Sequence, residues 1–537
     1  MGGRIRRCVF AANLVALFAF ALWCRVTSLK TAPTANGDDA FYGVQAERLV
    51  QGERLTSKTP SRKPVEVLYT AVEALLLEIW PPSYAVQRAP AVIFGILGIV
   101  LTYVLGARFL DRPTALIAAG LVATLPIAII YSRIGWEYSE VPPLCMLIIT
   151  FAARADRSRA NRIGMFVAYL ACFHINPTVL FLAPVPLGLM LVQWLKTASK
   201  SSPWGQRSLL ATMAGLAGLT VVAGLWTRNS ETTQGMYESF KFGPCDWPRF
   251  LTLYMRHHLG FGQGVLTETN PMLAWCFWGL VGVVVVFGSW QLIRQRAWDR
   301  LALVAGAIAS AAGYHLVVGP GGFHPDMPRY GLFLVVPNAL AFACLVQSLI
   351  VRPISAEAAV IRRLQVATVF LCAWMLMLNF RYNYFATFEA QAAEFHESFW
   401  TLKTESPDPM QRMASLVVKD LAASAKRPDP AVVIAEDWWT YKPLQLHLMR
   451  RKDIKVASLE HLVPEQKKRT LGHQLRAGGY AIGAVGGTVD TTIKALFPAE
   501  QLKQWQFQIG WHPRYVMYRL ENVGPALTAR SIEPARH

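Results

Sequence analysis

The stretch Arg88–Arg108, RAPAVIFGILGIVLTYVLGAR, decides the fold class of this chain. Its apolar run between two arginines has the length of about 20 residues that a helix needs to cross a lipid bilayer. Similar apolar runs occur near residues 8–24, 114–131, 138–153, 163–176, 178–195, 209–226, 272–293, 301–318, 329–350 and 364–380. We therefore predict an α-helical polytopic membrane protein with about 11 transmembrane helices.

The composition supports this class and excludes others. Hydrophobic residues make up 53% of the 537 residues and charged residues only 16%, against about 25% charged in a soluble domain. A soluble cytosolic enzyme, a disordered chain and a small secreted protein are thereby excluded. The net charge of +19 would suit a nucleic-acid partner. In a membrane protein, however, lysines and arginines collect on cytoplasmic loops, so we expect membrane lipids as partners and no nucleic acid.

The positions of the basic residues predict the orientation of the chain. When the N-terminus is placed in the cytoplasm, every second loop is short and basic. These loops carry Arg108/Arg112, Arg154–Arg162, Lys196–Arg207, Arg294–Arg300 and Arg352–Arg363. This pattern predicts a multi-pass protein of the cytoplasmic (inner) membrane with a cytoplasmic N-terminus. An odd number of spans then places the C-terminal part outside the cytoplasm.

The long outer segments predict the domain organisation. We expect a transmembrane domain over residues 1–380, with a large first outer loop at 28–87, and an extracytoplasmic α/β domain over 381–537. In this last part strands alternate with helices, which is typical of an α/β domain. The predicted strands are 431–435, 454–457, 480–485 and 515–520, and the predicted helices are 444–450 and 491–496. Its glycine pairs lack the spacing of a nucleotide site and are interpreted as turns.

Two amphipathic helices are predicted in the first outer loop. Val65–Trp80 places Glu66, Thr70 and Glu73 on one face and apolar residues on the other. Asp39–Val50 is a second, shorter piece of the same kind. Both are too short or too charged to span a membrane, and we expect them to lie on its surface.

Charged residues recur on the predicted outer side of the membrane, close to helix ends. The adjacent carboxylates Asp38 and Asp39 lie just after the first span. Further members are Arg62-Lys63, Arg133, Glu137, Glu140, His324, Asp326 and Arg329-Tyr330. Ionisable groups at the edge of a membrane are candidates for function.

One reaction suits these groups, namely transfer of a sugar from a lipid phosphate to an acceptor hydroxyl. The leaving group is already a phosphate, so it needs cations rather than a strong general acid. One carboxylate is enough to accept the proton of the acceptor hydroxyl. Displacement in a single step from the opposite face of the sugar inverts the anomeric centre.

Several motifs occur in an order that resembles a known family. They are Asp38-Asp39-Ala40-Phe41-Tyr42, Lys63-Pro64, Arg88, Tyr131-Ser132-Arg133 and Arg329-Tyr330. In these motifs the chain resembles the GT-C superfamily of polyprenyl-phosphate-sugar glycosyltransferases. The branch it resembles includes protein O-mannosyltransferase-like and aminoarabinose-transferase-like proteins. The resemblance covers the membrane part well and the C-terminal part only in general type.

The resemblance implies roles for individual residues. Asp38 matches the catalytic base, and Asp39, which replaces the usual Glu, is expected to assist or orient it. The substrate-binding residues that it implies are Tyr42, Lys63, Arg88, Arg133, Glu137, Glu140, Arg329 and Tyr330. Lys63 is expected to touch the lipid-linked phosphate, whereas Glu137 and Glu140 match the family's acidic residue only loosely. Phe41 stands where the aminoarabinose-type pattern has Arg, which argues against that particular sugar.

Other functions and other sites remain as alternatives. A membrane transporter or lipid flippase is the second hypothesis, although paired broken helices are not evident. A structural or sensor protein is the third. The sequence identifies no cofactor, and a divalent metal ion stays open, although His257-His258 lack a partner at ligand spacing. His174 and Asn176 line a cavity or satisfy backbone groups at a helix break, and Trp438-Trp439 stack on a ligand or pack in a core.

Overall fold

The computed structural model describes residues 2–30, 37–56, 65–197, 203–229, 271–318, 328–350, 409–423, 430–460, 462–509 and 512–520. The predicted span at 364–380 lies outside these residues, as does almost all of the second outer segment. The number of spans therefore stays a prediction. The chain divides into two compact units. The first contains residues 1–27, 56–69 and 89–387, and the second contains 28–55, 70–88 and 388–537.

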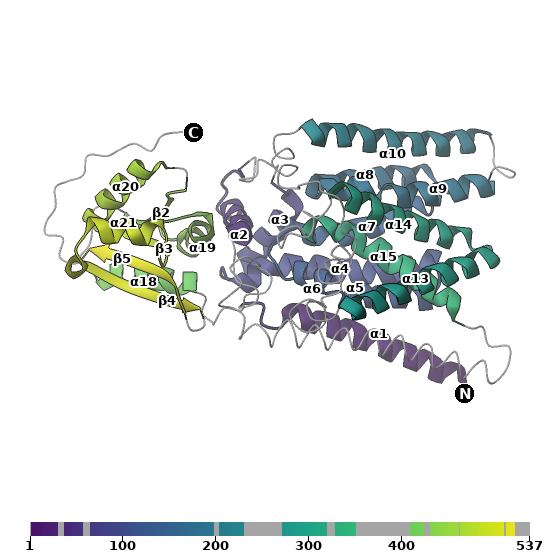
Figure 1. Ribbon diagram of the computed structural model, residues 1–537, viewed down its shortest axis with the longest axis horizontal. Coiled ribbons are helices and arrows are strands. Elements are labelled where there is room, and N and C mark those ends of the chain that lie inside the picture. The colour runs from purple at the N-terminus through teal and green to yellow at the C-terminus, as the bar shows by residue number, and fades with distance from the viewer. Residues whose placement is uncertain are drawn as a thin grey trace. The chain divides into compact units, whose positions relative to one another are not determined.

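Ten of the predicted apolar runs lie in the described residues, and all of them are helical (Figure 1). They form α1 (Gly2–Val26), α4 (Tyr84–Phe109), α5 (Arg112–Thr124), α6 (Pro126–Tyr131), α7 (Val141–Ala152), α8 (Arg159–Ile175), α9 (Pro184–Thr197), α10 (Pro203–Asn229), α13 (Pro271–Arg294), α14 (Trp298–Val318) and α15 (Val335–Leu349). Within the described residues, four helical stretches are long and apolar enough to cross a membrane. These are Tyr84–Phe109, Pro177–Thr197, Trp204–Leu225 and Tyr330–Leu349.

One predicted span is interrupted, and three others do not begin as regular α-helices. The run at 114–131 breaks between α5 and α6 at Leu125, whose backbone is extended ahead of Pro126. The other three runs begin with a 3₁₀ turn, namely η1 (Glu137–Glu140), η2 (Pro177–Leu182) and η4 (Pro328–Leu334). Pro126, Pro177 and Pro328 each open a new segment, because proline lacks an N–H and fits the start of a helix better than its interior.

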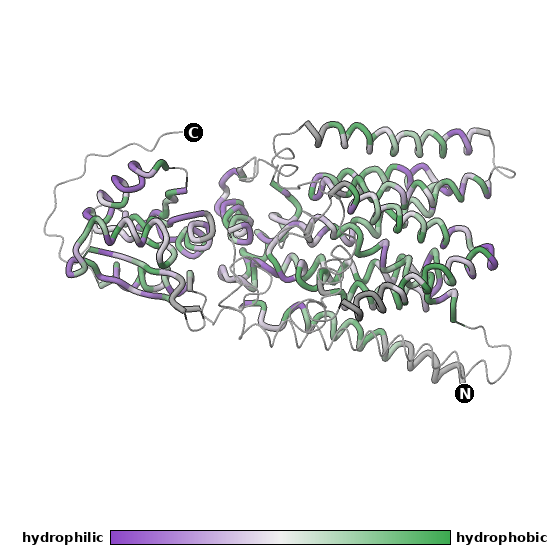
Figure 2. Tube along the Cα trace, viewed as in Figure 1, coloured by the Kyte–Doolittle hydropathy of each residue, from purple (hydrophilic) through white to green (hydrophobic). Residues whose placement is uncertain are grey.

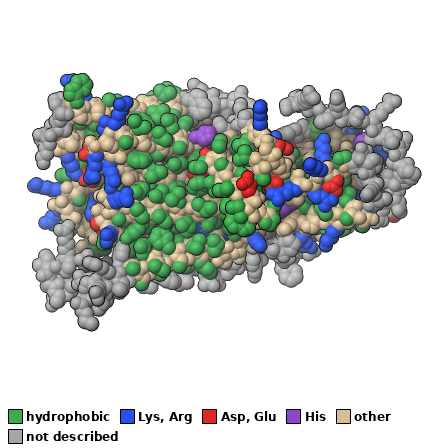
Figure 3. Space-filling model, turned by 180° about the vertical axis from the view of Figure 1, so that it is seen from behind, with side chains coloured by type: hydrophobic (Ala, Val, Ile, Leu, Met, Phe, Trp, Pro, Cys, Tyr) green, Lys and Arg blue, Asp and Glu red, His purple; other side chains and the backbone are tan. Residues whose placement is uncertain are grey.

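The first unit is a bundle whose apolar side chains point both inward and outward. Within it α7 packs against α8, α9 against α14, and α15 against α5 and α13. Gly306 of α14 allows a close approach to α9, because a Cβ there would lie 2.7 Å from the Val185 Cα. Hydrophobic residues run along these helices (Figure 2) and cover a broad band of the surface, with lysines and arginines gathered at one end (Figure 3). Such a band suits contact with lipid tails.

The C-terminal part of the second unit is a mixed α/β domain. Its sheet has the order β2-β1-β3-β5-β4, with β1 (Ala431–Ala435), β2 (Ile454–Ser458) and β3 (Tyr480–Ala484) parallel. The remaining strands, β4 (Leu502–Ile509) and β5 (His512–Leu520), are antiparallel. Alternate residues of each strand enter opposite cores. Val433 faces α18 (Pro409–Ala423) and α19 (Trp438–Leu448), whereas Ile434 faces α20 (Pro464–Arg476) and α21 (Thr488–Leu496).

The four predicted strands are confirmed, but the helices differ from the prediction. The sequence pattern does not predict β4, α18 or α20, and it predicts the start of α19 at residue 444 instead of Trp438. Asp437 starts α19, because its carboxylate accepts the Thr440 N–H while the Thr440 hydroxyl pairs with the Asp437 N–H in a capping box. The predicted glycine turn is present, since Gly486 has a φ of 77°. The Glu436 carboxylate accepts N–H groups from Ala484, Thr488 and Val489 at the start of α21.

Candidate functional site

The adjacent carboxylates lie in the first turn of α2 (Gly37–Val50), in the second unit. The N–H groups at the start of a helix carry a partial positive charge, which favours acidic residues there. The two side chains differ in exposure, since Asp38 is partly exposed whereas Asp39 is 1% exposed. They therefore have different environments although they are neighbours in sequence.

Asp39 is held by Arg88 at the start of α4. The Arg88 Nη2 and Nε lie 3.2 and 3.4 Å from Asp39 Oδ2, and Arg88 Nη1 donates to the Leu29 carbonyl at 2.9 Å. Gln87 adds a bond from its side-chain amide to the Asp39 carbonyl at 3.2 Å. Arg88, which the resemblance implies as a substrate ligand, is thus engaged with the protein itself. The arrangement fixes the first turn of α2 and, with it, the backbone of Asp38.

The side of α2 opposite Asp39 packs against α19 (Figure 1). Val44 of α2 forms a small buried cluster with Leu446 and Tyr84. The Arg450 guanidinium, just after α19, binds the buried Glu47 carboxylate with both branches, at 2.5 and 2.7 Å. The predicted helix at 39–50 is confirmed, but the prediction that it lies on the membrane surface is not supported. Protein surrounds α2 on most sides, and ten of its residues are buried.

The helix α3 (Val67–Ile79) confirms the other predicted amphipathic helix, and the exposure of its two faces indicates its surroundings. Glu73 and Thr70, on the polar face, are 0% exposed, whereas Leu75 and Ile79 on the apolar face are 58% and 62% exposed. An exposed apolar face with a buried polar face is the reverse of a helix on a soluble protein, and it suits contact with lipid.

Glu73 is a buried acid. Both of its carboxyl oxygens are buried without a hydrogen-bond partner among the described residues. Burial, and in second place the carboxylate of Asp39, raise the pKa of Glu73 well above its ordinary value. Burial therefore favours the protonated form of Glu73 over the ionised carboxylate, which would be poorly solvated there. The sequence pattern predicts only that Glu73 lies on a polar face, and nothing in it indicates a buried acid.

A second group of predicted site residues belongs to the first unit, at the start of α7. Glu137 and Glu140 are both buried in η1. Among the carboxylates, those of Glu66 and Glu137 have the largest electrostatic interactions with Glu140. The rings of Tyr138 and Tyr330 meet edge to face with 5.9 Å between their centroids. The structure thus groups Glu137, Glu140 and Tyr330 in one unit.

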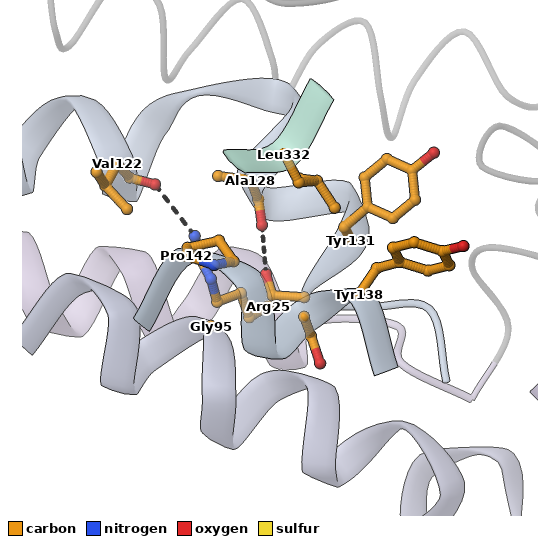
Figure 4. Close-up of a pocket in the computed structure, with 10 residues that line it drawn as sticks. Arg25, Gly95, Val122, Ala128, Tyr131, Tyr138, Pro142 and Leu332 are labelled. Atoms are coloured by element: carbon orange, nitrogen blue, oxygen red, sulfur yellow. Dashed lines mark hydrogen bonds between the residues drawn. The ribbon is translucent and has the colours of Figure 1, made fainter. Parts of the chain in front are cut away.

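Two buried arginines of the first unit bind backbone carbonyls. Arg133, implied as a substrate ligand, donates to the carbonyls of Cys24 and Thr27 at 2.6 and 2.7 Å and so caps the end of α1. Arg25, which no sequence motif indicates, donates to the carbonyls of Ala21 and Ala123 and lines a small cavity with Ser132 and Tyr138 (Figure 4). The cavity of about 10 Å³ has room for about one water molecule and is too small for a sugar or a lipid phosphate.

Asn176 has the structural role that was one of its two alternatives. It is buried and caps η2, and it donates to the Tyr330 carbonyl at 3.3 Å. Thr178 donates to the same carbonyl and to the Asn176 side chain. These bonds satisfy backbone groups at the break before α9. His174 is exposed.

Several predicted residues lie outside the described part of the chain. These are Arg62, Lys63, His257, His258, His324 and Asp326, together with the side chains of Arg329, Trp438 and Trp439. Their roles stay predictions. Among the described residues, no group of three or more His, Cys, Asp or Glu side chains is arranged to hold a metal ion.

No protein-family model matches the chain, and no curated protein matches its sequence. Solved structures do match. ArnT from Cupriavidus metallidurans in the apo state aligns over 98% of this chain and 100% of its own, with 12% identity and a TM-score of 0.52. The same protein bound to undecaprenyl phosphate aligns over 96% and 99%, with 14% identity and a TM-score of 0.54. The oligosaccharyltransferase of Archaeoglobus fulgidus gives a TM-score of 0.45 at 13% identity over 88% of this chain and 68% of its own.

The two ArnT structures establish the fold. Over nearly its whole length, the chain has the fold of the ArnT structures, a bundle of many helices followed by a C-terminal α/β region. This confirms, at the level of fold, the resemblance found in the sequence.

Proposed function

We propose that this chain, which has the fold of ArnT, is an inverting glycosyltransferase that moves a sugar from a polyprenyl-phosphate donor to an acceptor hydroxyl on the outer face of the cytoplasmic membrane. The observation that carries the proposal is the different environment of the two adjacent carboxylates. Asp39 is buried against Arg88, whereas Asp38 is partly exposed on the same rigid helical turn. A fixed but accessible carboxylate is what a general base requires.

The proposed reaction needs one proton transfer. Asp38 accepts the proton of the acceptor hydroxyl as its oxygen attacks the anomeric carbon, and the bond from that carbon to the phosphate breaks on the opposite face. The leaving phosphate keeps the bonding electrons, so cations must stabilise it. Lys63 and Arg329 are the proposed phosphate contacts. The Asp39–Arg88 pair holds the turn that carries Asp38.

The donor class is supported by the comparison with ArnT, one structure of which contains undecaprenyl phosphate. A chain of the same fold would bind the lipid between its helices and present the sugar at the outer surface. The acceptor is proposed only as a hydroxyl group of a glycan, lipid or protein.

The experiment is turnover by the purified full chain in liposomes with polyprenyl-phosphate-linked sugars. Asp38→Asn keeps the shape of the side chain and removes its basicity, so turnover should fall by about 10²–10⁴ while donor binding is kept. Asp453→Asn, which changes an exposed carboxylate of the same chain, is the matched control and should leave turnover unchanged.

Two results would contradict the proposal. Near-normal turnover by folded Asp38→Asn protein would remove Asp38 as the base. Movement of the lipid across the bilayer, without release of polyprenyl phosphate from its sugar, would favour the flippase alternative instead.

A further inference from the structure

Two cysteines of the first unit lie in contact between neighbouring helices. The sulfur atoms of Cys145 on α7 and Cys172 on α8 are 4.0 Å apart, and both side chains are 0% exposed. A disulfide bond has a sulfur–sulfur distance of about 2.05 Å, so the two sulfurs would have to approach by about 2 Å. A change of side-chain rotamer moves a cysteine sulfur over such a distance. Both residues belong to the same compact unit.

The helices α7 and α8 form a closely packed antiparallel hairpin. Cys145 lies opposite Cys172, and Phe151, later in α7, lies opposite Gly164, earlier in α8. A Cβ on Gly164 would lie 3.0 Å from the Phe151 ring, so the glycine lets this ring approach the backbone of α8. Such a close approach of two helices is what a disulfide between them requires.

One end of this hairpin is tied by hydrogen bonds. In the turn between the helices, the Asn161 side-chain amide donates to the Arg154 carbonyl at 2.7 Å, and the Arg162 guanidinium donates to the Ala155 carbonyl at 2.8 Å. The two cysteines lie toward the other end, in the second turn of α7 and the last turn of α8. A bond between them would therefore close the hairpin at the end that the turn does not hold.

The end with the cysteines is also where regular helix is interrupted. The 3₁₀ turn η1, which ends at Glu140, precedes α7, and η2 follows α8. The Cys172 carbonyl accepts the Asn176 N–H at 2.8 Å, and the Asn176 side chain donates to the Tyr330 carbonyl at 3.3 Å. A covalent link at Cys172 would thus join the start of α7, next to Glu140, to the segment that holds Tyr330.

The predicted orientation places this end of the hairpin where disulfides form. The turn between α7 and α8 carries the basic residues of Arg154–Arg162, which predict a cytoplasmic position. The opposite end, with both cysteines, is then on the outer side of the membrane. Disulfides form and persist outside the cytoplasm, whereas cytosolic thiols are kept reduced.

We propose that Cys145 and Cys172 form a disulfide bond in the mature protein, which links α7 to α8 and stabilises the outer end of their hairpin. One thiolate attacks the disulfide of an extracytoplasmic thiol oxidoreductase, and the second thiolate then attacks the mixed disulfide and releases the enzyme. The two cysteines lose two protons and two electrons, and the disulfide of the oxidoreductase is reduced to two thiols. Because both side chains are fully buried in the folded chain, this exchange precedes the packing of α7 on α8. The inference does not depend on the sugar transfer proposed above.

The first test uses the unaltered chain in membranes from the cells that make it. N-ethylmaleimide is present during lysis and denaturation, so that every free thiol is blocked, and peptide mass spectrometry then identifies the paired cysteines. The expected product is a linked pair of peptides that contain Cys145 and Cys172, lighter by two hydrogen atoms than the two thiol peptides. Cys344, a buried free cysteine of α15, is the internal control and should carry the reagent. Reagent on both Cys145 and Cys172 would overturn the inference, as would pairing of either with another cysteine.

The second test measures the melting temperature of the purified chain before and after reduction by a phosphine. Reduction should lower it by about 5 °C, because the bond closes a loop of 27 positions and restricts the unfolded chain. Cys145→Ala and Cys172→Ala should show no such fall, whereas the control Cys344→Ala should keep it. A linked pair whose complete reduction leaves the melting temperature unchanged would refute the stabilising role. If a variant fails to fold, the unaltered chain in both tests still decides the matter.

Discussion

The buried pair of Asp39 and Arg88 allows a sharp prediction about stability. Both side chains are 1% exposed, and Arg88 also supplies the bond to the Leu29 carbonyl. Arg88→Met keeps the aliphatic stem but leaves the Asp39 carboxylate buried without its partner. Removing one member of a buried ion pair costs about 3–5 kcal/mol, so we expect a loss of this size.

The chain contains a matched control for this change. Arg451 and Asp453 form an ion pair at 2.6 Å, which is shorter than the 3.2 Å of the buried pair, but their side chains are 40% and 56% exposed. Exposed pairs contribute about 0–1 kcal/mol, so Arg451→Met should have little effect despite the shorter distance. Burial, and not distance, is predicted to decide the cost.

The assay is the free energy of unfolding in mixed micelles, with helix content followed by circular dichroism. The double variant Asp39→Asn/Arg88→Met should recover much of the loss, because it no longer leaves a buried charge alone. A loss below about 1 kcal/mol for Arg88→Met, or a loss equal to that of Arg451→Met, would refute the reasoning. So would a double variant that is less stable than the sum of the two single changes.

The other predictions concern Glu73, the contact of α2 with α19, the α3 surface and the orientation. The pKa of Glu73 is raised in the folded chain. The contribution of protonated Glu73 to the free energy of unfolding is therefore complete below the ordinary pKa of a glutamate, and it is lost as the pH rises toward the raised pKa. Glu73→Gln should therefore raise the melting temperature at pH 8 and change it little at pH 4; equal changes at both would contradict this. Arg450→Met should lower turnover and leave binding of undecaprenol unchanged, as measured in nanodiscs, because it frees α2 from α19. A fluorophore at Leu75→Cys should report a lipid environment and one at Glu500→Cys water, and equal spectra would exclude lipid contact of α3. An impermeant reagent should label Glu500→Cys in spheroplasts; labelling only after lysis would place the C-terminal domain in the cytoplasm.

Local patterns were enough to predict most of the elements. The apolar run Arg88–Arg108 became α4, because a helix in lipid needs only a sufficient length of apolar residues. The strands at 431–435 and 480–485 follow from short runs of apolar residues, which are buried in the structure. The start of α2 at the two aspartates, with the proposed base in its first turn, also follows from neighbours in sequence.

The partners of these residues depend on the tertiary structure. Asp39 and Arg88 are 49 positions apart, and Glu47 and Arg450 are 403 apart, so no helical or strand spacing relates them. The sequence pattern places Asp39 beside the proposed base and Glu73 on the polar face of a surface helix, although Asp39 binds an arginine and burial raises the pKa of Glu73.

The sequence by itself determined most of the membrane helices, four of the five strands of the C-terminal domain and the position of Asp38, since each depends on residues within a few turns of chain. Only the tertiary structure decided which charges are buried and which are paired. The physical reason is that burial and pairing arise when distant segments pack together, and the free energy of a charge depends on that packing more than on its neighbours in sequence.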